Sequence, residues 1–512
     1  MSDAPVRTAR LGGEIRARGF LGGARSRTGN IVVSVCLGAG LLIAVTAGGL
    51  GGLAAGAAIF GSGYLLTRQN PLTGRSPGTE LILRGWWALR RRRGETELIP
   101  VYLAEPIPVP TTKADRRAAG RWARRVRDEA PGLEGIQWLS GPDDTAVLLH
   151  RCPGEQSYLS VAIEVDGQPA GLRAQSDYDR AAAAYGHLLA RLARDEGLIS
   201  GIQSVTRIMP TDSAVHERWA ADHVDPQAPT ALTQSYAELV RMTAGATEMM
   251  RHYLVLRLPV TTVFARAAAA HGEGETGWAR LAVEQAQWVA TLARRADLRN
   301  PRLVSTHRLA ALLRHLQNPQ FPLDQTVDVT SDTWLRSRRT LRHAAVVDES
   351  WWHRVAVIPS SAVTPEPVHT RWIAPLLHGI THPVIRTISL HVEVQPAAKA
   401  RRRAREDVTV DRGIRDAALR RGSVDDGTQV VQLSASAQRL ADLQPGSGIH
   451  GARWAGYLCV TAADEDQVMR ASTALADAAG ECGISHLDWL DTRHDTAMPT
   501  TWPVWRGMEA QP

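Results

Sequence analysis

The stretch that decides the fold of this 512-residue chain runs from Ile31 to Leu66 and reads IVVSVCLGAGLLIAVTAGGLGGLAAGAAIFGSGYLL. Its 36 residues include no Asp, Glu, Lys, Arg or His. As a single helix it would be about 54 Å long, against a hydrocarbon core of about 30 Å. One straight crossing of a bilayer therefore does not account for the whole stretch.

Glycines in the middle of the stretch indicate where the chain reverses. They are Gly48, Gly49, Gly51 and Gly52. Glycine permits a tight reversal that β-carbons would obstruct. We predict an N-terminal transmembrane helical hairpin over residues 31–66, with the arms Ile31–Ala47 and Leu53–Leu66. The second arm is short for a full crossing, which favours a shallow insertion or a locally thinned bilayer.

The basic residues of the chain are concentrated around this stretch. Residues 1–93 carry thirteen arginines and three acids, a charge of +10, and the other 419 residues sum to −3. Arg-rich flanks stay on the cytoplasmic side of a membrane, and an even number of crossings places both flanks there. We expect a multi-pass protein of the cytoplasmic (inner) membrane with both termini in the cytoplasm. Its basic leader would cover residues 1–30 and its juxtamembrane segment residues 67–96.

A tryptophan pair and an arginine run follow the apolar stretch. These residues are Trp86, Trp87, Arg90, Arg91, Arg92 and Arg93. Tryptophan is enriched at the headgroup level, and clustered arginines are attracted by anionic lipids. We predict that this segment lies at the membrane interface; the alternative is that the two tryptophans are core residues.

A secretory signal peptide is the alternative interpretation of the apolar stretch, because small residues surround Ala54–Ala57. The thirty-residue basic leader and the length of the apolar run disfavour it. The cysteines are isolated and show no disulfide framework or metal spacing, as expected of a cytosolic body. They are Cys36, Cys152, Cys459 and Cys482.

The rest of the chain predicts an α/β (α+β) cytoplasmic body in two domains, 97–318 and 319–512. In the first domain we expect strands at 97–103, 136–139, 145–151, 159–165, 202–209, 253–262 and 302–305, and helices at 115–128, 178–196, 231–249, 278–296 and 308–316. In the second domain we expect strands at 352–358, 384–394, 454–461 and 484–490, helices at 372–377 and 465–480, and a helical insertion at 396–444. This order is typical of ferredoxin-like split β-α-β units. No internal sequence repeat is strong enough to assert.

The sequence indicates no catalytic constellation, and we predict a protein that is not an enzyme and has no cofactor. The two lysines, Lys113 and Lys399, do not follow glycine, so the phosphate-binding loop of Walker-type ATPases is absent. The histidine pairs 216/223, 307/315 and 378/382 lack a completing ligand, so we predict no metal site. Asp488 and Asp491 are interpreted as ordinary surface carboxylates. An anchored body without visible chemistry is most simply an assembly component.

Several short motifs resemble an actinobacterial family of membrane-anchored proteins encoded with conjugative type IV secretion systems. They are Leu313-Arg314 with Asn318-Pro319, Asp348–His353, Arg371–Leu377, Val384–Leu390, Pro396–Ala400, and Ala497–Pro499 with Trp505–Met508. Within them, the residues that mark the family are Trp372, Pro375, Arg386, Thr387, Ser389, Pro499 and Gly507. Members are similar to a two-span membrane subunit joined to the N-terminal, non-ATPase domain of CagE/TrbE-type secretion ATPases.

The resemblance implies a structural or coupling role in DNA or protein transfer across the cytoplasmic membrane. Its partners would be a secretion ATPase in trans, other secretion-system subunits and the anionic lipids of the membrane, in a homo- or hetero-oligomer. One alternative is the two-span E component of a type VII secretion system. Another is a nucleic-acid-binding conjugation protein, suggested by the run Lys399–Arg405 but disfavoured by the acids that follow it. An enzyme with an unfamiliar site is the third.

Overall fold

We analysed a computed structural model of the chain. It describes residues 8–9, 27–68, 75–105, 112–167, 173–193, 197–210, 219–220, 222–225, 227–244, 248–323, 329–380, 384–420, 427–445 and 449–507. Most of the predicted basic leader therefore lies outside the described residues. From it, β1 (Thr8–Ala9) pairs with β12 (Val368–His369).

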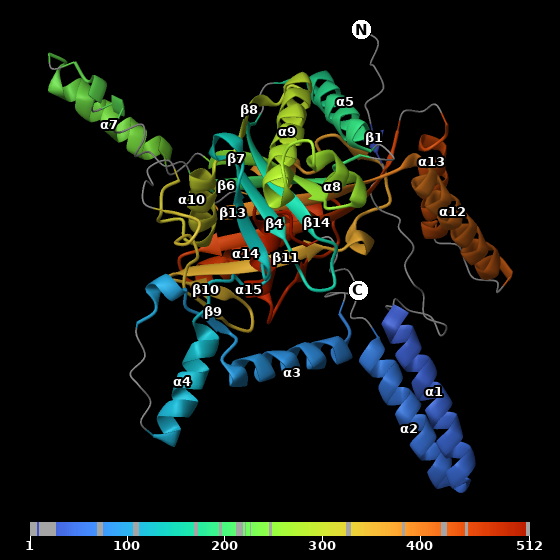
Figure 1. Cartoon of the computed structure of the whole chain (residues 1–512). Coiled ribbons are helices and arrows are strands. Elements are labelled where there is room, and N and C mark those ends of the chain that lie inside the picture. The colour runs from blue at the N-terminus through green and yellow to red at the C-terminus, as the bar shows by residue number, and fades with distance from the viewer. Residues whose placement is uncertain are drawn as a thin grey trace.

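The N-terminal helices lie apart from the body of the molecule (Figure 1). Helices α1 (Arg27–Ala47) and α2 (Gly49–Thr67) are antiparallel neighbours that project away from it. Helix α3 (Pro77–Arg93) runs across the underside of the body, between the helix pair and α4 (Lys113–Arg125). The segments predicted to meet the membrane thus lie on one side of the molecule.

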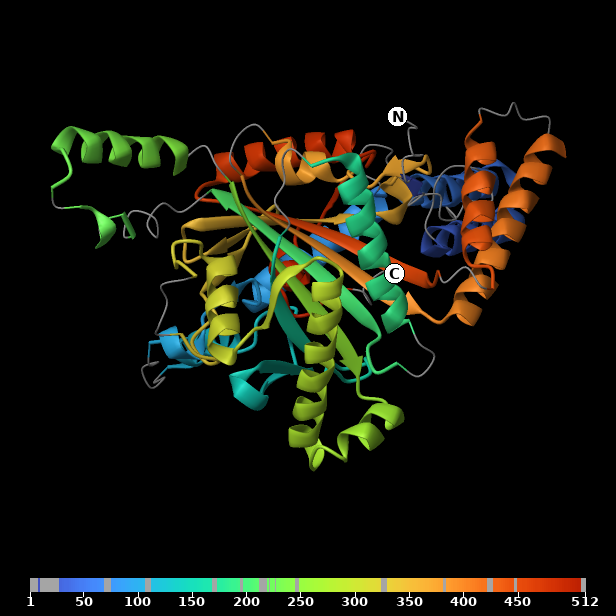
Figure 2. The same cartoon turned by 90° about the horizontal axis from the view of Figure 1, so that it is seen from above.

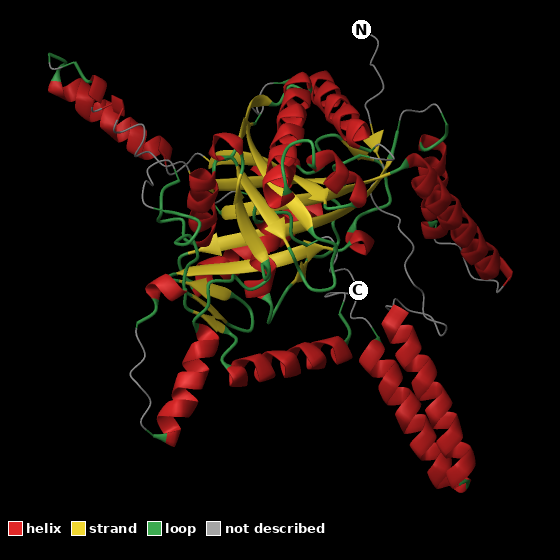
Figure 3. Ribbon diagram, in the orientation of Figure 1, coloured by secondary structure: helices red, strands yellow, loops and turns green. Residues whose placement is uncertain are grey.

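One antiparallel sheet forms the centre of the body (Figure 3), with 13 strands among the described residues. Its order is β2 (Glu97–Leu98), β9 (Arg338–Thr340), β10 (Ala345–Val347), β11 (Trp351–Ile358), β14 (Gly451–Ala462), β13 (Ile385–Gln395), β6 (Gly201–Pro210), β7 (Glu248–Pro259), β5 (Tyr158–Asp166), β4 (Ala146–His150) and β3 (Ile136–Ser140). Off this path, β15 (Asp488–Trp489) pairs with β11 and β8 (Arg299–Leu303) pairs with β5.

The sheet contains the same connectivity twice. The first unit has, in chain order, β5, α5 (Gln175–Leu192), β6, β7, α9 (Gly274–Arg295) and β8. Across the sheet its strands lie in the order β8-β5-β7-β6. In the second, β11, α11 (Ala374–His378), β13, β14, α14 (Glu465–Glu481) and β15 give the order β15-β11-β14-β13. The two halves of the chain therefore have equivalent topology, although the sequence shows no assertable repeat.

The two units are joined edge to edge. β6 pairs antiparallel with β13 from Gly201 opposite Glu393 to Ile208 opposite Arg386. The division predicted after residue 318 is therefore not a boundary of the sheet. Hydrogen bonds across this pair make one continuous layer of the two predicted domains.

Each unit carries a helical arm between its second and third strands. The arm of the first unit contains α7 (Thr230–Ala244), and that of the second contains α12 (Ala397–Arg420) and α13 (Thr428–Asp442). Because β6 and β13 run in opposite directions, the arms leave at opposite ends of the sheet (Figure 2). The predicted insertion 396–444 corresponds to the second arm, apart from residues 421–426, which lie outside the described residues.

The core lies on both faces of the sheet. Helices α5 and α9 cover one face of the first unit, and α14 and α11 pack against the second. The other face is covered by α10 (Thr306–Gln317) and by residues near the C-terminus, including Met498, Trp502 and Trp505. β13 serves both layers because successive side chains of a strand point to opposite faces: Ile388 packs on the α14 side, and Ser389 faces the C-terminal segment.

Most predicted elements agree with the structure to within a few residues. One difference is the strand predicted over 97–103, which is only β2 followed by the 3₁₀ helix η1 (Val101–Leu103), since Pro100 lacks the N–H that would continue a ladder. A second is the helix predicted over 231–249, which ends at Ala244. A third is the strand predicted over 484–490, of which only Asp488–Trp489 forms a strand. The remaining short elements are η2 (Pro142–Asp144), α8 (Thr262–Ala268), η3 (Ser360–Ala362), α15 (His494–Ala497) and η4 (Met498–Thr501).

Candidate membrane interface

Small residues let α1 and α2 pack with their backbones in contact. A Cβ added at Gly40 would lie 2.6 Å from the carbonyl oxygen of Gly56, and one added at Gly56 would overlap the carbonyl of Gly40. A Cβ at Gly63 would lie 2.6 Å from the sulfur of Cys36. Close approach over small residues is the way helices associate in lipid, where no hydrophobic effect drives them together.

The reversal between the two helices is shorter than predicted. Gly48 and Gly49 have φ angles of 61° and 62°, in the left-handed region that favours glycine. Gly51 and Gly52, predicted as part of the turn, instead lie in the first turns of α2. Two left-handed residues suffice to reverse the chain, and Gly52 serves packing, because a Cβ there would lie 3.2 Å from the Ala47 Cβ.

The earlier start lengthens the second arm. α2 has 19 residues, about 28 Å of helix, so the predicted short arm is wrong. Among the described residues, α2 is the one helix that is long and apolar enough to cross a bilayer; the apolar part of α1, Ile31–Ala47, is shorter. Both helices present apolar side chains outward, with Leu42 at 64%, Val45 at 79% and Leu50 at 88% exposure.

Arg75, two residues before α3, binds the body. Its Nε donates to Oδ1 of Asp488 at 2.6 Å, and Nη2 donates to the backbone oxygen of Trp489. Nη1 lies 3.8 Å from Oδ2 of Asp491. Burial raises the pKa of Asp488 and the charge of Arg75 opposes that rise. The two aspartates interpreted as ordinary surface carboxylates therefore hold Arg75, and with it the start of α3, on the body.

Helix α3 is well defined at both ends and buries no residue. Ser76 accepts a hydrogen bond from the backbone N–H of Thr79, and Gly94 ends the helix with a φ of 76°. Ile82, Trp86 and Leu89 lie at i, i+4 and i+7, on one face of the helix. Their exposures are 61%, 62% and 39%. α3 is thus an amphipathic helix whose apolar face points away from the body.

The predicted interface residues divide between the two faces of α3. Trp86 is exposed, whereas Trp87 is half-buried with the guanidinium of Arg91 5.5 Å from its ring centre. Arg91, Arg92 and Arg93 are exposed at the C-terminal end. Their positive charges are favourable there because a helix carries partial negative charge at its C-terminus.

Arg90 instead points into the body. Its Nη2 and Nη1 lie 2.5 and 3.4 Å from the two carboxylate oxygens of Asp495, and Nη1 also donates to the backbone oxygen of Thr492 at 3.3 Å. The side chain of Asp495 is 2% exposed. Together with Arg75, Arg90 clamps α3 to the C-terminal part of the chain.

His494 connects this clamp to the sheet. Its Nδ1 accepts the backbone N–H of Val355 at 3.0 Å, and its Nε2 lies 3.3 Å from Oδ1 of Asp491. Burial lowers the pKa of His494. At Asp491 burial opposes ionisation, but the contacts with His494, Arg354 and Arg75 bring the pKa below its usual value. The imidazole is therefore neutral, with its proton on Nε2.

Three of the residues that mark the family resemblance gather on the α14 side of the sheet. Arg386 on β13 is fully buried and forms a bidentate pair with Glu248, at 2.6 and 2.8 Å. Its Nε donates to the carbonyl oxygen of Leu376 at 3.0 Å. This contact orients α11, which contains Pro375 and follows Trp372. The structure thus places Arg386 as the anchor of a buried ion pair.

The other marked residues lie on β13 or within residues 498–507, which we call the C-terminal strap. Gln203 donates to Ser389 at 2.9 Å and to the backbone oxygen of Trp502 at 2.8 Å, and its Oε1 accepts the N–H of Trp505 at 2.7 Å. These contacts hold the strap, which contains Pro499, against β6 and β13. At the end of the strap, the hydroxyl of Tyr457 donates to the carbonyl of Gly507. The predicted closing segment is therefore part of the core; its last residue, Met508, lies outside the described residues.

Beneath the strap lies a buried arginine without a carboxylate partner in the described part of the chain. Arg207 on β6 donates to the hydroxyl of Thr387 at 2.9 Å. Its Nε and Nη2 have no hydrogen-bond partner among the described residues. Burial lowers the pKa of Arg207 to about 10. The sequence contained no signal for this site, since nothing local marks a strand arginine as buried.

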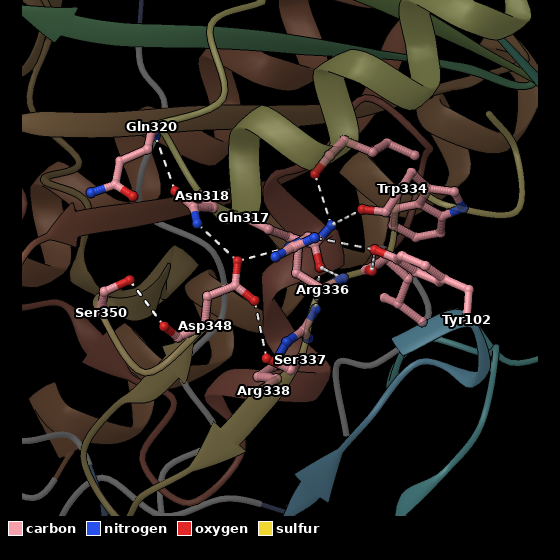
Figure 4. A network of polar contacts seen from close by, with 12 residues as sticks. Tyr102, Gln317, Asn318, Gln320, Trp334, Arg336, Ser337, Arg338, Asp348 and Ser350 are labelled. Carbon is pink, nitrogen blue, oxygen red and sulfur yellow. Dashed lines mark hydrogen bonds and ion pairs between the residues drawn. The ribbon is translucent and has the colours of Figure 1, made fainter. Parts of the chain in front are cut away.

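A polar network joins two further motifs of the resemblance (Figure 4). Asp348 accepts from Asn318 and from Nε of Arg336, both at 2.8 Å, and from the hydroxyl of Ser337 at 3.0 Å. Asp348 and Glu349 have φ angles of 48° and 58° and form the turn between β10 and β11. The network therefore fixes a hairpin turn against the end of α10.

The arm of the second unit carries the basic run considered for nucleic acid. Arg402 and Arg403 are exposed, and Arg402 Nε lies 3.5 Å from Oε1 of Glu406. Asp411 is buried in the same helix. Acids interleaved with these arginines reduce the attraction of the arm for a phosphate backbone.

Of the three histidine pairs, only His307 and His315 both lie within the described residues. His307 is exposed and His315 is buried on the same helix, where His315 Nδ1 lies 2.8 Å from the backbone oxygen of Phe321. His216 and His382 lie outside the described residues. Within the described ranges, no group of three or more His, Cys, Asp or Glu is placed to hold a metal ion.

Comparison with known proteins identifies no family for the chain. No family model matches the chain, and no curated protein matches it. The contacts that define the interface, above all those of Arg75, Arg90 and Asp495, join residues far apart in the sequence.

Proposed function

We propose that the chain is a membrane-anchored structural or coupling component of a conjugative type IV secretion system. The observation that carries this proposal is the attachment of the body to the apolar helix pair. Arg75 binds Asp488, and Arg90 binds Asp495. A flexible tether would leave the body free to turn, whereas these contacts hold α3 on the body, and α3 in turn packs against α2.

The proposed location is the cytoplasmic membrane, with both termini on the cytoplasmic side. Exposed leucines and valines along α1 and α2 support insertion, because apolar surface of this extent is costly in water. The outward apolar face of α3, next to Arg91–Arg93, supports a position for this helix at the headgroup level. The predicted membrane hairpin and interface are thus parts of one proposal.

We further infer that the two units of the sheet are ferredoxin-like. Each has β-α-β-β-α-β connectivity with its first and third strands in the middle of its four, which is the arrangement of that fold. The arms at opposite ends of the sheet give the body two separated surfaces for neighbouring subunits (Figure 2).

In this proposal a separate secretion ATPase supplies nucleotide hydrolysis. Support comes from the sequence: neither Lys113 nor Lys399 follows a glycine, so neither is the lysine of a phosphate-binding loop. The family resemblance supplies the class of partner. The role of the chain would be to hold that ATPase at the membrane.

Co-purification tests the recruitment. The tagged full chain is co-expressed with the Walker-type ATPase encoded nearest to its gene, extracted in mild detergent and purified. We expect the ATPase to be retained by the chain and lost when the tag is on an unrelated two-span protein. Recovery of a monodisperse chain alone rejects recruitment, and retention of small WxG-type substrates with their ATPase favours the type VII alternative.

Thiol labelling of intact cells tests the topology. A cysteine is introduced at the exposed residue Arg180 in a chain whose four cysteines are replaced. We expect an impermeant maleimide to label it only after the cells are opened. Labelling in intact cells places the body outside and overturns the proposed function.

A further inference from the structure

A second basic helix stands on the membrane-facing side of the molecule. α4 has six basic residues and one acid within 13 residues. The basic residues are Lys113, Arg116, Arg117, Arg121, Arg124 and Arg125. The side chains of Arg116, Arg117 and Arg124 are exposed.

The attachment of α4 to the body is at its C-terminal end. Arg125 Nη1 lies 3.0 Å from Oε2 of Glu97. The N–H of Ile99 donates to the backbone oxygen of Arg125 at 2.8 Å, and the N–H of Arg127 donates back to Ile99 at 3.1 Å. The N-terminal end of α4 is therefore the end that is far from the body.

That far end extends in the direction of the proposed membrane. Figure 1 shows α4 projecting from the underside of the body on the same side as α1 and α2, and beyond α3. The helix pair and α4 lie at opposite ends of α3 in this view. A bilayer that contains the pair and touches α3 would therefore also meet the N-terminal part of α4.

The net positive charge of α4 favours binding to an anionic surface. The acid of the helix, Asp115, is engaged in a capping box: its carboxylate accepts the N–H of Thr112 at 2.9 Å, and the Thr112 hydroxyl accepts the N–H of Asp115. The exposed side chains of Arg116 and Arg117 follow directly. Each arginine near an anionic bilayer strengthens binding about fivefold.

We propose that α4 is a second, peripheral membrane contact that binds anionic phospholipid headgroups. This inference rests on the proposed membrane anchoring and adds a lipid class and a place to it. Attachment at two separated points, the helix pair and α4, stops the whole molecule from tilting relative to the bilayer. The arms are then presented to neighbouring subunits in one orientation.

Hydrogen exchange of the full chain in nanodiscs tests this contact. Nanodiscs of phosphatidylcholine alone are compared with nanodiscs that also contain phosphatidylglycerol. We expect exchange of residues 113–125 to slow by about fivefold or more when phosphatidylglycerol is present. The charge-reversed variant Arg116→Glu with Arg117→Glu should lose this slowing.

The control variant Arg180→Glu with Arg191→Glu has the same charge change on α5, at the other side of the body. It should keep the slowing. Equal exchange of residues 113–125 in the two lipids, with α1 and α2 protected in both, overturns this inference and leaves the membrane anchor intact. Loss of protection of α1 and α2 instead overturns the anchor. Slowing by added duplex DNA without a response to phosphatidylglycerol also rejects the lipid contact, in favour of nucleic acid.

Discussion

Arg90 and Asp495 are 405 positions apart in the sequence, yet two guanidinium nitrogens of Arg90 face the two carboxylate oxygens of Asp495, at 2.5 and 3.4 Å. This pair ties the helix that follows the apolar hairpin to the last segment of the core. Arg75 with Asp488 makes a similar connection just before the start of the same helix. The body is therefore fixed to α3 by charge pairs between residues from opposite ends of the chain.

Replacement of Arg90 by Met should release α3. The change leaves the carboxylate of Asp495 buried without its charge partner, and breaking such a pair costs about 3 kcal/mol of unfolding free energy. Chemical unfolding of the full chain in detergent measures the loss, and hydrogen exchange of α3 shows its release. Arg84→Met removes an exposed i,i+4 pair with Glu80 and should cost under about 0.5 kcal/mol. Equal effects of the two variants would contradict the clamp.

Substitution of Gly56 by Val should separate α1 from α2. A side chain at this position overlaps the carbonyl of Gly40, and relief of that overlap costs about 1 to 3 kcal/mol. We expect faster hydrogen exchange in both helices in nanodiscs. Gly61→Val is the matched control, since a Cβ there meets no atom within 4 Å. If Gly56→Val exchanges as slowly as the control, the helices do not pack through this glycine.

An arginine at Leu42 should weaken membrane insertion. A charged residue near the middle of a spanning helix costs about 2.5 to 3.5 kcal/mol on translocon scales. Fractionation after alkaline extraction should move a large part of Leu42→Arg from the membrane to the supernatant. Val101→Arg, an exposed apolar position of the body, should stay in the membrane fraction like the unmodified chain. Full retention of Leu42→Arg argues against a spanning α1.

Acidification should destabilise the body through its buried histidines. Burial lowers the pKa of His353 to about 3 and that of His391 to about 4, against an unfolded value of about 6.5. The unfolded chain therefore binds protons first: stability is complete above pH 6.5 and falls as the pH drops toward the folded values. Between pH 6.5 and 5 each histidine should cost about 2 kcal/mol.

Urea unfolding of the full chain at several pH values measures this loss. The variant His391→Gln should show a shallower fall than the unmodified chain, because one of the titrating groups is removed. A free energy of unfolding that is constant from pH 7 to 5 excludes the proposed protonation cost.

Replacement by Met should change the stability of the protein differently at two buried arginines. Arg207→Met removes a charge that has no carboxylate partner in the described residues, so we expect stability to change by less than about 1 kcal/mol or to rise. Arg386→Met leaves Glu248 unpaired in a site with little solvent and should cost about 3 to 5 kcal/mol. Thermal unfolding of the two variants under the same conditions measures this difference in stability. A larger loss for Arg207→Met would show that this cation has a partner of its own.

The positions of most helices and strands follow from the sequence because they depend on local patterns. The run Tyr158–Asp166 is mostly apolar, with β-branched residues at Val161, Ile163 and Val165, and it forms β5. The apolar stretch from Ile31 to Leu66 forms two helices because uninterrupted apolar residues with central glycines allow little else. Its turn is shorter than predicted, since four nearby glycines are equivalent in sequence and only Gly48 and Gly49 adopt positive φ.

The motif residues show the limit of such patterns. Arg386 and Ser389 lie three positions apart on one strand, yet one pairs with Glu248 on one face of the sheet and the other meets Gln203 on the opposite face. The alternation of a strand predicts that they face apart. It does not predict their partners, which come from other strands.

The sequence by itself determined the apolar hairpin, the basic flank, the alternation of strands and helices, and the absence of a phosphate-binding lysine. Only the tertiary structure decided that the two halves share one sheet with equivalent topology, and that Arg75 and Arg90 bind aspartates near the C-terminus. The reason is physical: backbone conformation responds to neighbours within a few residues, whereas strand order and buried charge pairs depend on contacts whose separation along the chain leaves no local trace.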